Sequence, residues 1–149
     1  MNDPNDPNII NEFSGSYRFL SNFWSCYISY EGVDYPSVEN AYQAAKCAAL
    51  ADRVRFQHIT ASEAKKLGRL IQMRPDWNDV RVQIMTDLVR QKFSDPSLAA
   101  KLLETGDIEL QEGNWWGDVF WGTVNGVGQN VLGNILMKVR KELRDERGS

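Results

Sequence analysis

Helix-start signals recur along the chain after residue 36, and they constrain its fold more than any other feature. An N-cap serine stands at Ser37, a capping-box pair at Thr60 and Glu63, and a first-turn proline at Pro96. Apolar residues at helical spacing mark two further segments near the middle and the end of the chain. The sequence therefore predicts separate helices over about residues 37–46, 60–71, 78–93, 96–105 and 130–145.

The segment before these helices has the composition of β-strands. Aromatic and β-branched residues gather between Phe13 and Tyr35, and Gly32 separates two short runs that predict a hairpin of residues 26–30 and 33–35. Residues 108–110 are typical of one more short strand. We expect an α+β fold: a single, mostly helical domain with a small antiparallel β-sheet.

The two ends of the expected domain differ in pattern. Residues 1–12 repeat Asn-Asp-Pro without a helical period, which predicts a flexible N-terminal tail. No repeat or linker divides the rest, so residues 13–145 are expected to form the domain.

Charge and composition exclude several classes of protein. Seventeen basic and twenty acidic residues give a net charge of −3, whereas a protein that grips long nucleic acid usually has a basic surplus. No apolar run is long enough for a membrane span and no signal peptide is visible, which predicts a cytoplasmic protein. Cys26, Cys47 and His58 lack the spacing of a zinc site, so we expect no metal and two free thiols.

The stretch YPSVENAYQAAK, residues 35–46, carries the first candidate for chemistry. Glu39, Gln43 and Lys46 are spaced by four and three residues, so they share one face of the predicted helix. The ordinary alternative is that Glu39 and Lys46 are solvated charges on an exposed face.

A glycine- and tryptophan-rich loop over residues 112–129 carries the second candidate. Asp118 lies between Trp116 and Trp121 in this loop, and long ordered loops in compact domains are often functional. The alternative for Asp118 is a turn-forming role.

A third candidate is Trp77 in the RPDW stretch, residues 74–77. It is either a helix-entry staple or a platform on which a planar ligand stacks.

Two carboxylates, a lysine and several indoles suit one reaction class among others: hydrolysis of the bond between a sugar and a planar base. That cleavage passes through an oxocarbenium-like transition state, which a nearby carboxylate can stabilise. A carboxylate can also activate water as a general base. The reaction needs no metal or redox cofactor.

Five motifs in order resemble the NADAR superfamily of the YbiA-like type. They are FLSNF at 19–23, YPSVENAYQAAK at 35–46, RPDW at 74–77, DVFWG at 118–122 and GQNVLGNILMKVRKEL at 128–143. The resemblance covers residues 13–143, nearly the whole chain.

The resemblance implies an N-glycosidase that acts on a small molecule carrying a phosphorylated ribose. YbiA-like members hydrolyse early phosphorylated riboflavin-pathway intermediates and release ribose 5-phosphate. By motif, the catalytic positions fall on Glu39, Trp77 and Asp118. Lys46 is expected beside them, either to neutralise the substrate phosphate or to attack the opened ribose aldehyde. The expected substrate-binding residues are Phe19, Ser21, Asn22, Gln43, Trp121, Gly122 and Asn130.

Two other functions stay open. Other NADAR members remove ADP-ribose from guanine in nucleic acid, which would make ADP-ribosylated DNA or RNA the partner. A sensor module that binds ADP-ribose or an NAD-like ligand without turnover is the non-enzymatic alternative.

One residue departs from the family pattern, which commonly has His where Asn40 follows Glu39. We expect this difference to alter the pKa of Glu39 or the choice of substrate. The sequence leaves the leaving base and the oligomeric state open.

Overall fold

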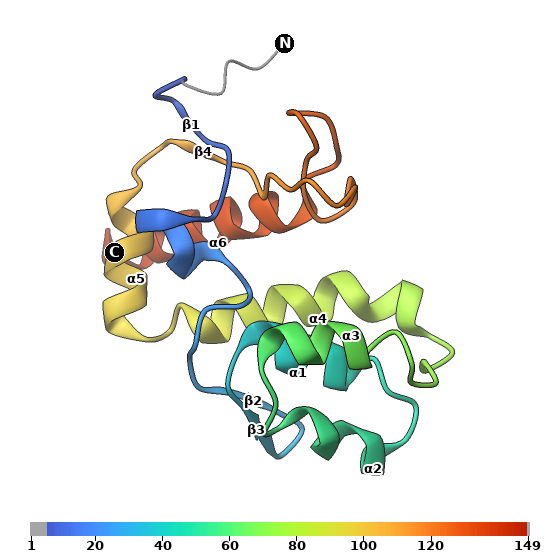
Figure 1. Ribbon diagram of the computed structural model, residues 1–149. Helices are drawn as coiled ribbons and strands as arrows, with labels where there is room; N and C mark the ends of the chain where they lie inside the picture. Colours follow the sequence, from blue (N-terminus) through green and yellow to red (C-terminus); the bar gives the residue numbers. More distant parts are fainter. Residues whose placement is uncertain (1–5, 149) are drawn as a thin grey trace. The chain divides into compact units, whose positions relative to one another are not determined.

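The computed structural model describes residues 6–148, and within it the chain forms two compact units. One unit consists of residues 22–92, and the other combines the residues before and after that segment. Figure 1 shows the order of elements along the chain. The two units are described separately below.

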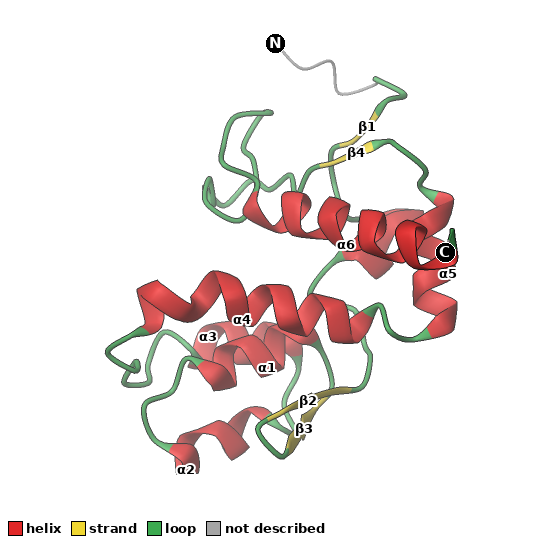
Figure 2. Cartoon of the chain, turned by 180° about the vertical axis from the view of Figure 1, so that it is seen from behind, coloured by secondary structure: helices red, strands yellow, loops and turns green. Residues whose placement is uncertain are grey.

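The unit of residues 22–92 is a helical layer with one β-hairpin (Figure 2). Strand β2 (Ile28–Tyr30) pairs antiparallel with β3 (Val33–Tyr35), with Ile28 opposite Tyr35. Helix α1 (Val38–Ala45) packs against the hairpin, α3 (Ala61–Leu67) and α4 (Trp77–Lys92). The short helices α2 (Leu50–Arg53) and η2 (Val54–Phe56) complete the unit.

Small side chains on α1 explain its central place in this unit. Ala41, Ala44 and Ala45 are fully buried, so neighbouring elements approach the helix closely. Ser37 caps the helix by accepting a hydrogen bond from the amide of Asn40 at 3.0 Å. This helix is the element that carries Glu39, Gln43 and Lys46.

The second unit is built around the long C-terminal helix α6 (Val131–Arg147). Helix α5 (Pro96–Glu104) and strand β4 (Glu109–Leu110) pack against α6. Strand β1 (Ile9–Ile10) pairs in parallel with β4, and the short helix η1 (Gly15–Leu20) follows it. The segment between β4 and α6 contains the glycine- and tryptophan-rich loop, where Gly113 and Thr123 form an isolated bridge.

The helix-start signals are confirmed. Thr60 and Glu63 form both hydrogen bonds of a capping box, and the Asp95 side chain caps α5 ahead of its first-turn proline. The expected hairpin and the α+β class are also present. Helix α3 ends at Leu67 rather than near residue 71, with Gly68 at its C-cap.

Some elements differ from expectation. The flexible tail was expected over residues 1–12, but Ile10 is buried and the strand Ile9–Ile10 pairs with β4. The first five residues of that expected tail lie outside the described part. The pair β1–β4 is parallel, whereas only antiparallel pairing was expected. The short helices η1, α2 and η2 carry too few residues for a periodic signal.

No helix within residues 6–148 is long and apolar enough to cross a bilayer.

Candidate functional site

The predicted site residues divide between the two units. The unit of residues 22–92 holds Asn22, Glu39, Gln43, Lys46 and Trp77. The other unit holds Phe19, Ser21, Asp118, Trp121, Gly122 and Asn130.

Glu39 lies in the first turn of α1, where the helix dipole favours a carboxylate. Its backbone amide donates to the carbonyl of Asn22 at 3.0 Å, which joins the FLSNF motif to the start of the helix. Its carboxylate oxygen Oε2 accepts a hydrogen bond from Gln43 Nε2 at 3.1 Å. The side chain is partly exposed. The shared helix face predicted for Glu39 and Gln43 is therefore confirmed as a direct contact.

Lys46 follows the last turn of the same helix and reaches α3. Its ammonium donates to the carbonyl of Gly68 at 2.8 Å. Burial lowers the pKa of Lys46, and the neighbouring Arg69 acts in the same direction, while Cys47 and Glu39 act against it. A lysine with a lowered pKa has a larger neutral fraction at physiological pH, and the neutral amine is the nucleophilic form.

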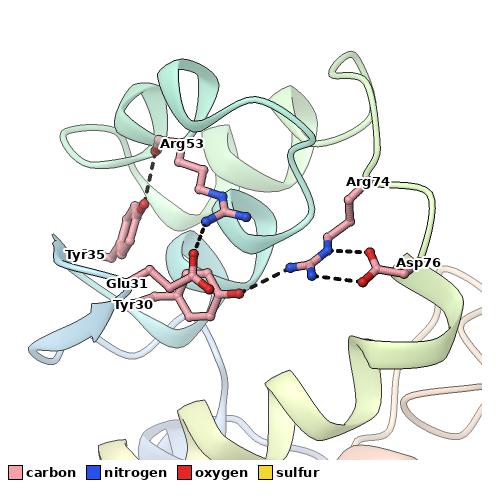
Figure 3. A network of polar contacts seen from close by, with 6 residues as sticks. All are labelled: Tyr30, Glu31, Tyr35, Arg53, Arg74 and Asp76. Carbon is pink, nitrogen blue, oxygen red and sulfur yellow. Dashed lines mark hydrogen bonds and ion pairs between the residues drawn. The ribbon is translucent and has the colours of Figure 1, made fainter.

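Arg74 joins Lys46 to Trp77 through the backbone. The amide of Arg74 donates to the carbonyl of Lys46 at 2.9 Å, and the amide of Trp77 donates to the carbonyl of Arg74 at 3.2 Å. The guanidinium is held by Asp76 through two hydrogen bonds of 2.6 and 3.0 Å and reaches the hydroxyl of Tyr30 (Figure 3). The RPDW motif thus fixes the start of α4 against the end of α1.

Trp77 is only 5% exposed, and its ring packs against Tyr42 of α1 at 4.9 Å between centroids. This contact gives Trp77 a packing role between α4 and α1, the staple-like alternative. A ring so deeply buried offers little face for a stacked base, so the structure favours the packing role, and the platform role stays a prediction.

A second polar contact in Figure 3 ties the hairpin to α2. Arg53 pairs with Glu31 at the hairpin turn, and its guanidinium lies 5.3 Å from the ring centroid of Tyr30. Tyr35 donates its hydroxyl hydrogen bond to the carbonyl of Arg53. These contacts hold the hairpin against α2.

Asn40 has a structural role that the sequence analysis did not anticipate. It is fully buried, and its amide nitrogen donates to the carbonyls of Phe56 and Ile59 at 2.9 and 2.8 Å. Its amide oxygen accepts from Ser37. Because these contacts engage both ends of the amide, Asn40 supports the segment of residues 56–59, and its expected effect on Glu39 stays a prediction.

Asp118 is held by the backbone of its own loop. Its Oδ1 accepts hydrogen bonds from the amides of Phe120 and Trp121 at 3.1 and 2.9 Å. The turn-forming role considered for this residue is therefore present. The hydrogen bonds found for its side chain in the described part of the chain all use Oδ1, so Oδ2 is left for another contact.

Asn114 is a site-supporting residue that the sequence analysis missed. Its side chain accepts from the amide of Asp118 at 2.9 Å and donates to the carbonyl of the same residue at 2.8 Å. It also donates to Glu112 Oε2 at 3.2 Å, which places a second carboxylate in this loop. Residues four apart in a loop give no periodic signal, so only the structure reveals these contacts. We call the hydrogen bonds of Asn114 with Glu112 and Asp118 the Asn114 clamp.

The same loop has aromatic rings at its surface. Trp115 is 85% exposed and lies edge-to-face with Trp116 at 5.7 Å. Trp121 is partly buried and lies edge-to-face with Phe120 at 4.9 Å. A Cβ at Gly122 would overlap Glu112, so glycine is required there for close packing.

The other expected binding residues have supporting contacts. Phe19 is buried, with the Lys101 ammonium 5.7 Å from its ring centroid. The amide of Ser21 donates to the Arg18 carbonyl at the end of η1. The side chain of Asn130 accepts from the amide of Glu112 and donates to the carbonyl of Leu110, at 3.0 and 2.9 Å. Phe19 and Asn130 therefore have packing and loop-supporting contacts, and their substrate-binding roles stay predictions.

Among residues 6–148, no group of three or more potential metal-ligating side chains gathers in one place. The predicted site residues of the two units supply carboxylates, amides, indoles and the ammonium of Lys46, whose pKa is lowered.

Comparison with known proteins decides the family. The sequence model of the NADAR domain matches residues 10–144. The chain belongs to the NADAR family. This match spans both units, and it agrees with the resemblance of the five motifs.

NADAR relatives with established names share most of this chain. An N-glycosidase of Nostoc punctiforme is 39% identical over 137 residues, which cover 87% of each chain. The N-glycosidase YbiA of Escherichia coli is 33% identical over 146 residues, 93% of this chain and 91% of that protein. A riboflavin biosynthesis protein of Vibrio vulnificus is 43% identical over 139 residues, and the match spans 36% of that longer protein.

The NADAR fold is also shared with a solved structure. The NMR structure of E. coli YbiA matches with a TM-score of 0.79 and 31% identity, over 91% of this chain and 83% of that one. The predicted enzyme class, a hydrolase acting on N-glycosyl compounds, is the class of these named relatives.

Proposed function

We propose that this chain is an N-glycosidase that hydrolyses the bond between C1 of a 5′-phosphorylated ribose and a planar base. The proposed substrate is an early intermediate of riboflavin biosynthesis, and the sugar product is ribose 5-phosphate. The N-glycosidase class is supported by relatives that match nearly the whole chain. The riboflavin context is supported by the name of the Vibrio relative.

The observation that carries the proposal is the placement of Glu39. Its carboxylate is partly exposed at the start of α1, accepts a hydrogen bond from Gln43, and acts electrostatically on Lys46. A carboxylate that neighbouring donors hold in one orientation suits a reaction in which positive charge develops on a sugar ring. A freely solvated glutamate would have to be oriented during each turnover.

The reaction adds one water across the glycosidic bond. As the bond to the base nitrogen breaks, Glu39 stabilises the ribosyl cation and takes a proton from the attacking water. The hydroxyl oxygen bonds to C1, and the proton taken by Glu39 passes to the nitrogen of the leaving base, which restores the carboxylate. Lys46 meets the substrate phosphate or the aldehyde of the opened sugar.

Asp118 and Trp77 have proposed roles that rest on the family motifs. Asp118 would bind ribose hydroxyls through Oδ2, because Oδ1 already accepts two backbone hydrogen bonds. Trp77 would set the position of α1 through Tyr42 and offer its remaining exposed edge to the base. Variants Asp118→Asn and Trp77→Phe, assayed beside Glu39→Gln, test these roles.

The deciding experiment offers the purified protein two substrates separately. One is the phosphorylated riboflavin-pathway pyrimidine, and the other is an oligonucleotide carrying ADP-ribosylated guanine. Mass spectrometry identifies the products, with Glu39→Gln as the inactive control. Release of ribose 5-phosphate from the pyrimidine alone is the expected result.

The other outcomes select the alternatives. Release of ADP-ribose from the oligonucleotide alone would replace the proposed substrate with ADP-ribosylated nucleic acid. If neither substrate is cleaved while calorimetry detects ADP-ribose binding, a sensor module replaces the enzyme.

A further inference from the structure

Gly68, at the C-cap of α3, contacts two predicted site residues through different atoms. Its carbonyl accepts the hydrogen bond from Lys46 Nζ at 2.8 Å. Its Cα faces the side chain of Gln43 so closely that an added Cβ would overlap Gln43 Oε1 and lie 2.7 Å from Gln43 Cδ. The backbone angles of Gly68, φ −60° and ψ −19°, suit any residue. An alanine at position 68 would therefore fit the backbone conformation but displace the end of the Gln43 side chain.

The amide of Gln43 is held between Gly68 and Glu39. Because the carboxylate of Glu39 only accepts hydrogen bonds, the amide must present Nε2 to it and turn Oε1 away. That oxygen is buried against Gly68. The close approach of α3 thus limits how far the amide can swing from the carboxylate.

We propose that Gly68 is a positioning residue for Glu39 and acts through Gln43. The missing Cβ lets the end of α3 press on the Gln43 amide and keep its N–H on the carboxylate, while the Gly68 carbonyl fixes Lys46. Gln43 is then a positioning residue as well, instead of the substrate contact that the sequence predicted. The catalytic consequence rests on the proposed function, but the contact between these side chains does not.

The substitution Gly68→Ala tests this contact. Exchange of glycine for alanine at a compatible backbone position is otherwise neutral or stabilising. Any loss therefore comes from overlap with Gln43, and the added change Gln43→Ala should relieve it. Gly148→Ala is the matched control, because Gly148 is the C-cap of α6 with φ −85° and its built Cβ meets no atom closer than 3.6 Å.

Nuclear magnetic resonance follows the contact without reference to activity. The side-chain amide signals of Gln43, assigned by their loss in Gln43→Ala, should shift with pH as Glu39 titrates, and should not do so in Glu39→Gln. In Gly68→Ala we expect this titration to disappear, and in Gly148→Ala to persist. A Gln43 signal that titrates in Gly68→Ala as in the wild type would overturn the proposal.

Kinetics with the phosphorylated pyrimidine test the catalytic consequence. We expect Gly68→Ala to lower kcat/KM about 10-fold or more, the scale of a lost hydrogen bond to a charged group. The acid limb of its pH–rate profile should move to higher pH, because a carboxylate that loses a donor is protonated more easily. In the Gln43→Ala background, Gly68→Ala should cost no further activity, and a fully additive loss would contradict the proposal.

Two further results remain decisive. If Gly68→Ala does not fold, the double variant with Gln43→Ala should fold, and its failure to do so would overturn the steric argument. If the wild type cleaves no substrate, the proposed function fails, while the titration of Gln43 still decides the role of Gly68.

Discussion

At the scale of single residues, Glu39 and Asp118 are carboxylates held in different ways. Glu39 is oriented by a side-chain amide on the same helix, whereas Asp118 is held by amides of its own loop. A helix position is fixed by packing along its whole length, but a loop position depends on local hydrogen bonds. We therefore expect the role of Glu39 to be separable from folding.

Glu39→Gln is the direct test of that expectation. Glutamine keeps the shape of the side chain but removes its negative charge and its ability to take a proton. We expect kcat to fall at least about 100-fold, the usual contribution of a general base, with the melting temperature nearly unchanged. Steady-state kinetics and circular dichroism measure both quantities. The exposed Glu104→Gln serves as control, and near-wild-type turnover of Glu39→Gln would remove this residue from the mechanism.

The role of Lys46 can be read from a covalent adduct. Because burial lowers the pKa of Lys46, we expect its neutral amine to attack C1 of the opened ribose 5-phosphate. The adduct then loses water and becomes an imine. Borohydride then reduces the imine to a stable secondary amine, and peptide mass spectrometry locates it on Lys46. The exposed Lys66 should stay unmodified. No adduct, together with a raised KM in Lys46→Gln, would assign the lysine to phosphate binding instead.

At the scale of elements, the loop of residues 112–129 depends on one clamp. Asn114 joins both backbone groups of Asp118 and the carboxylate of Glu112. Removing it by Asn114→Ala should free the loop and lower kcat/KM about 10-fold, since several hydrogen bonds that orient Asp118 are lost. Steady-state kinetics measure kcat/KM for this variant and for the control Asn134→Ala, which changes an exposed asparagine of α6. Unchanged kcat/KM would show that Asp118 does not need the clamp.

Helix α4 buries a charged group at its last turn. Lys92 is 2% exposed, and burial lowers its pKa to about 8. Between that value and about 10.4, the pKa in an unfolded chain, the unfolded protein binds the proton and the folded protein does not. The cost of burying the ammonium is therefore fully present below pH 8 and is relieved as pH rises through this window.

Lys92→Met should remove that cost while keeping the length of the side chain. We expect the free energy of unfolding at pH 7 to rise by about 1–3 kcal/mol, and the gain to shrink towards pH 10. Urea unfolding at both pH values measures it. A gain that is equal at pH 7 and pH 10 would show that desolvation of the charge is not the cause.

At the scale of the whole molecule, charge bears on the choice of substrate. The net charge is −3, so binding of a long polyanion is expected to be weak at physiological salt. Titration with a labelled, unmodified single-stranded DNA, followed by fluorescence anisotropy, should show no saturation at micromolar protein. Tight binding with a steep salt dependence would favour the nucleic-acid substrate over the metabolite.

The sequence by itself determined the longer helices, the hairpin and the family. Ser37, the capping box at Thr60 and the Asp95 cap act within a few residues, so their signals can be read along the chain. The face shared by Glu39 and Gln43 follows from helical periodicity in the same way. The five motifs were enough to indicate the NADAR superfamily.

Only the tertiary structure decided which residues support the site. Gly68 meets Gln43, Asn40 meets the η2 segment, and Trp77 is buried against Tyr42, through contacts between elements that are distant in sequence. Asn114 grips Asp118 across an irregular loop, where no period exists to predict it. Steric fit and hydrogen bonds of this kind depend on where packed elements meet in space, and no local pattern of residues encodes that.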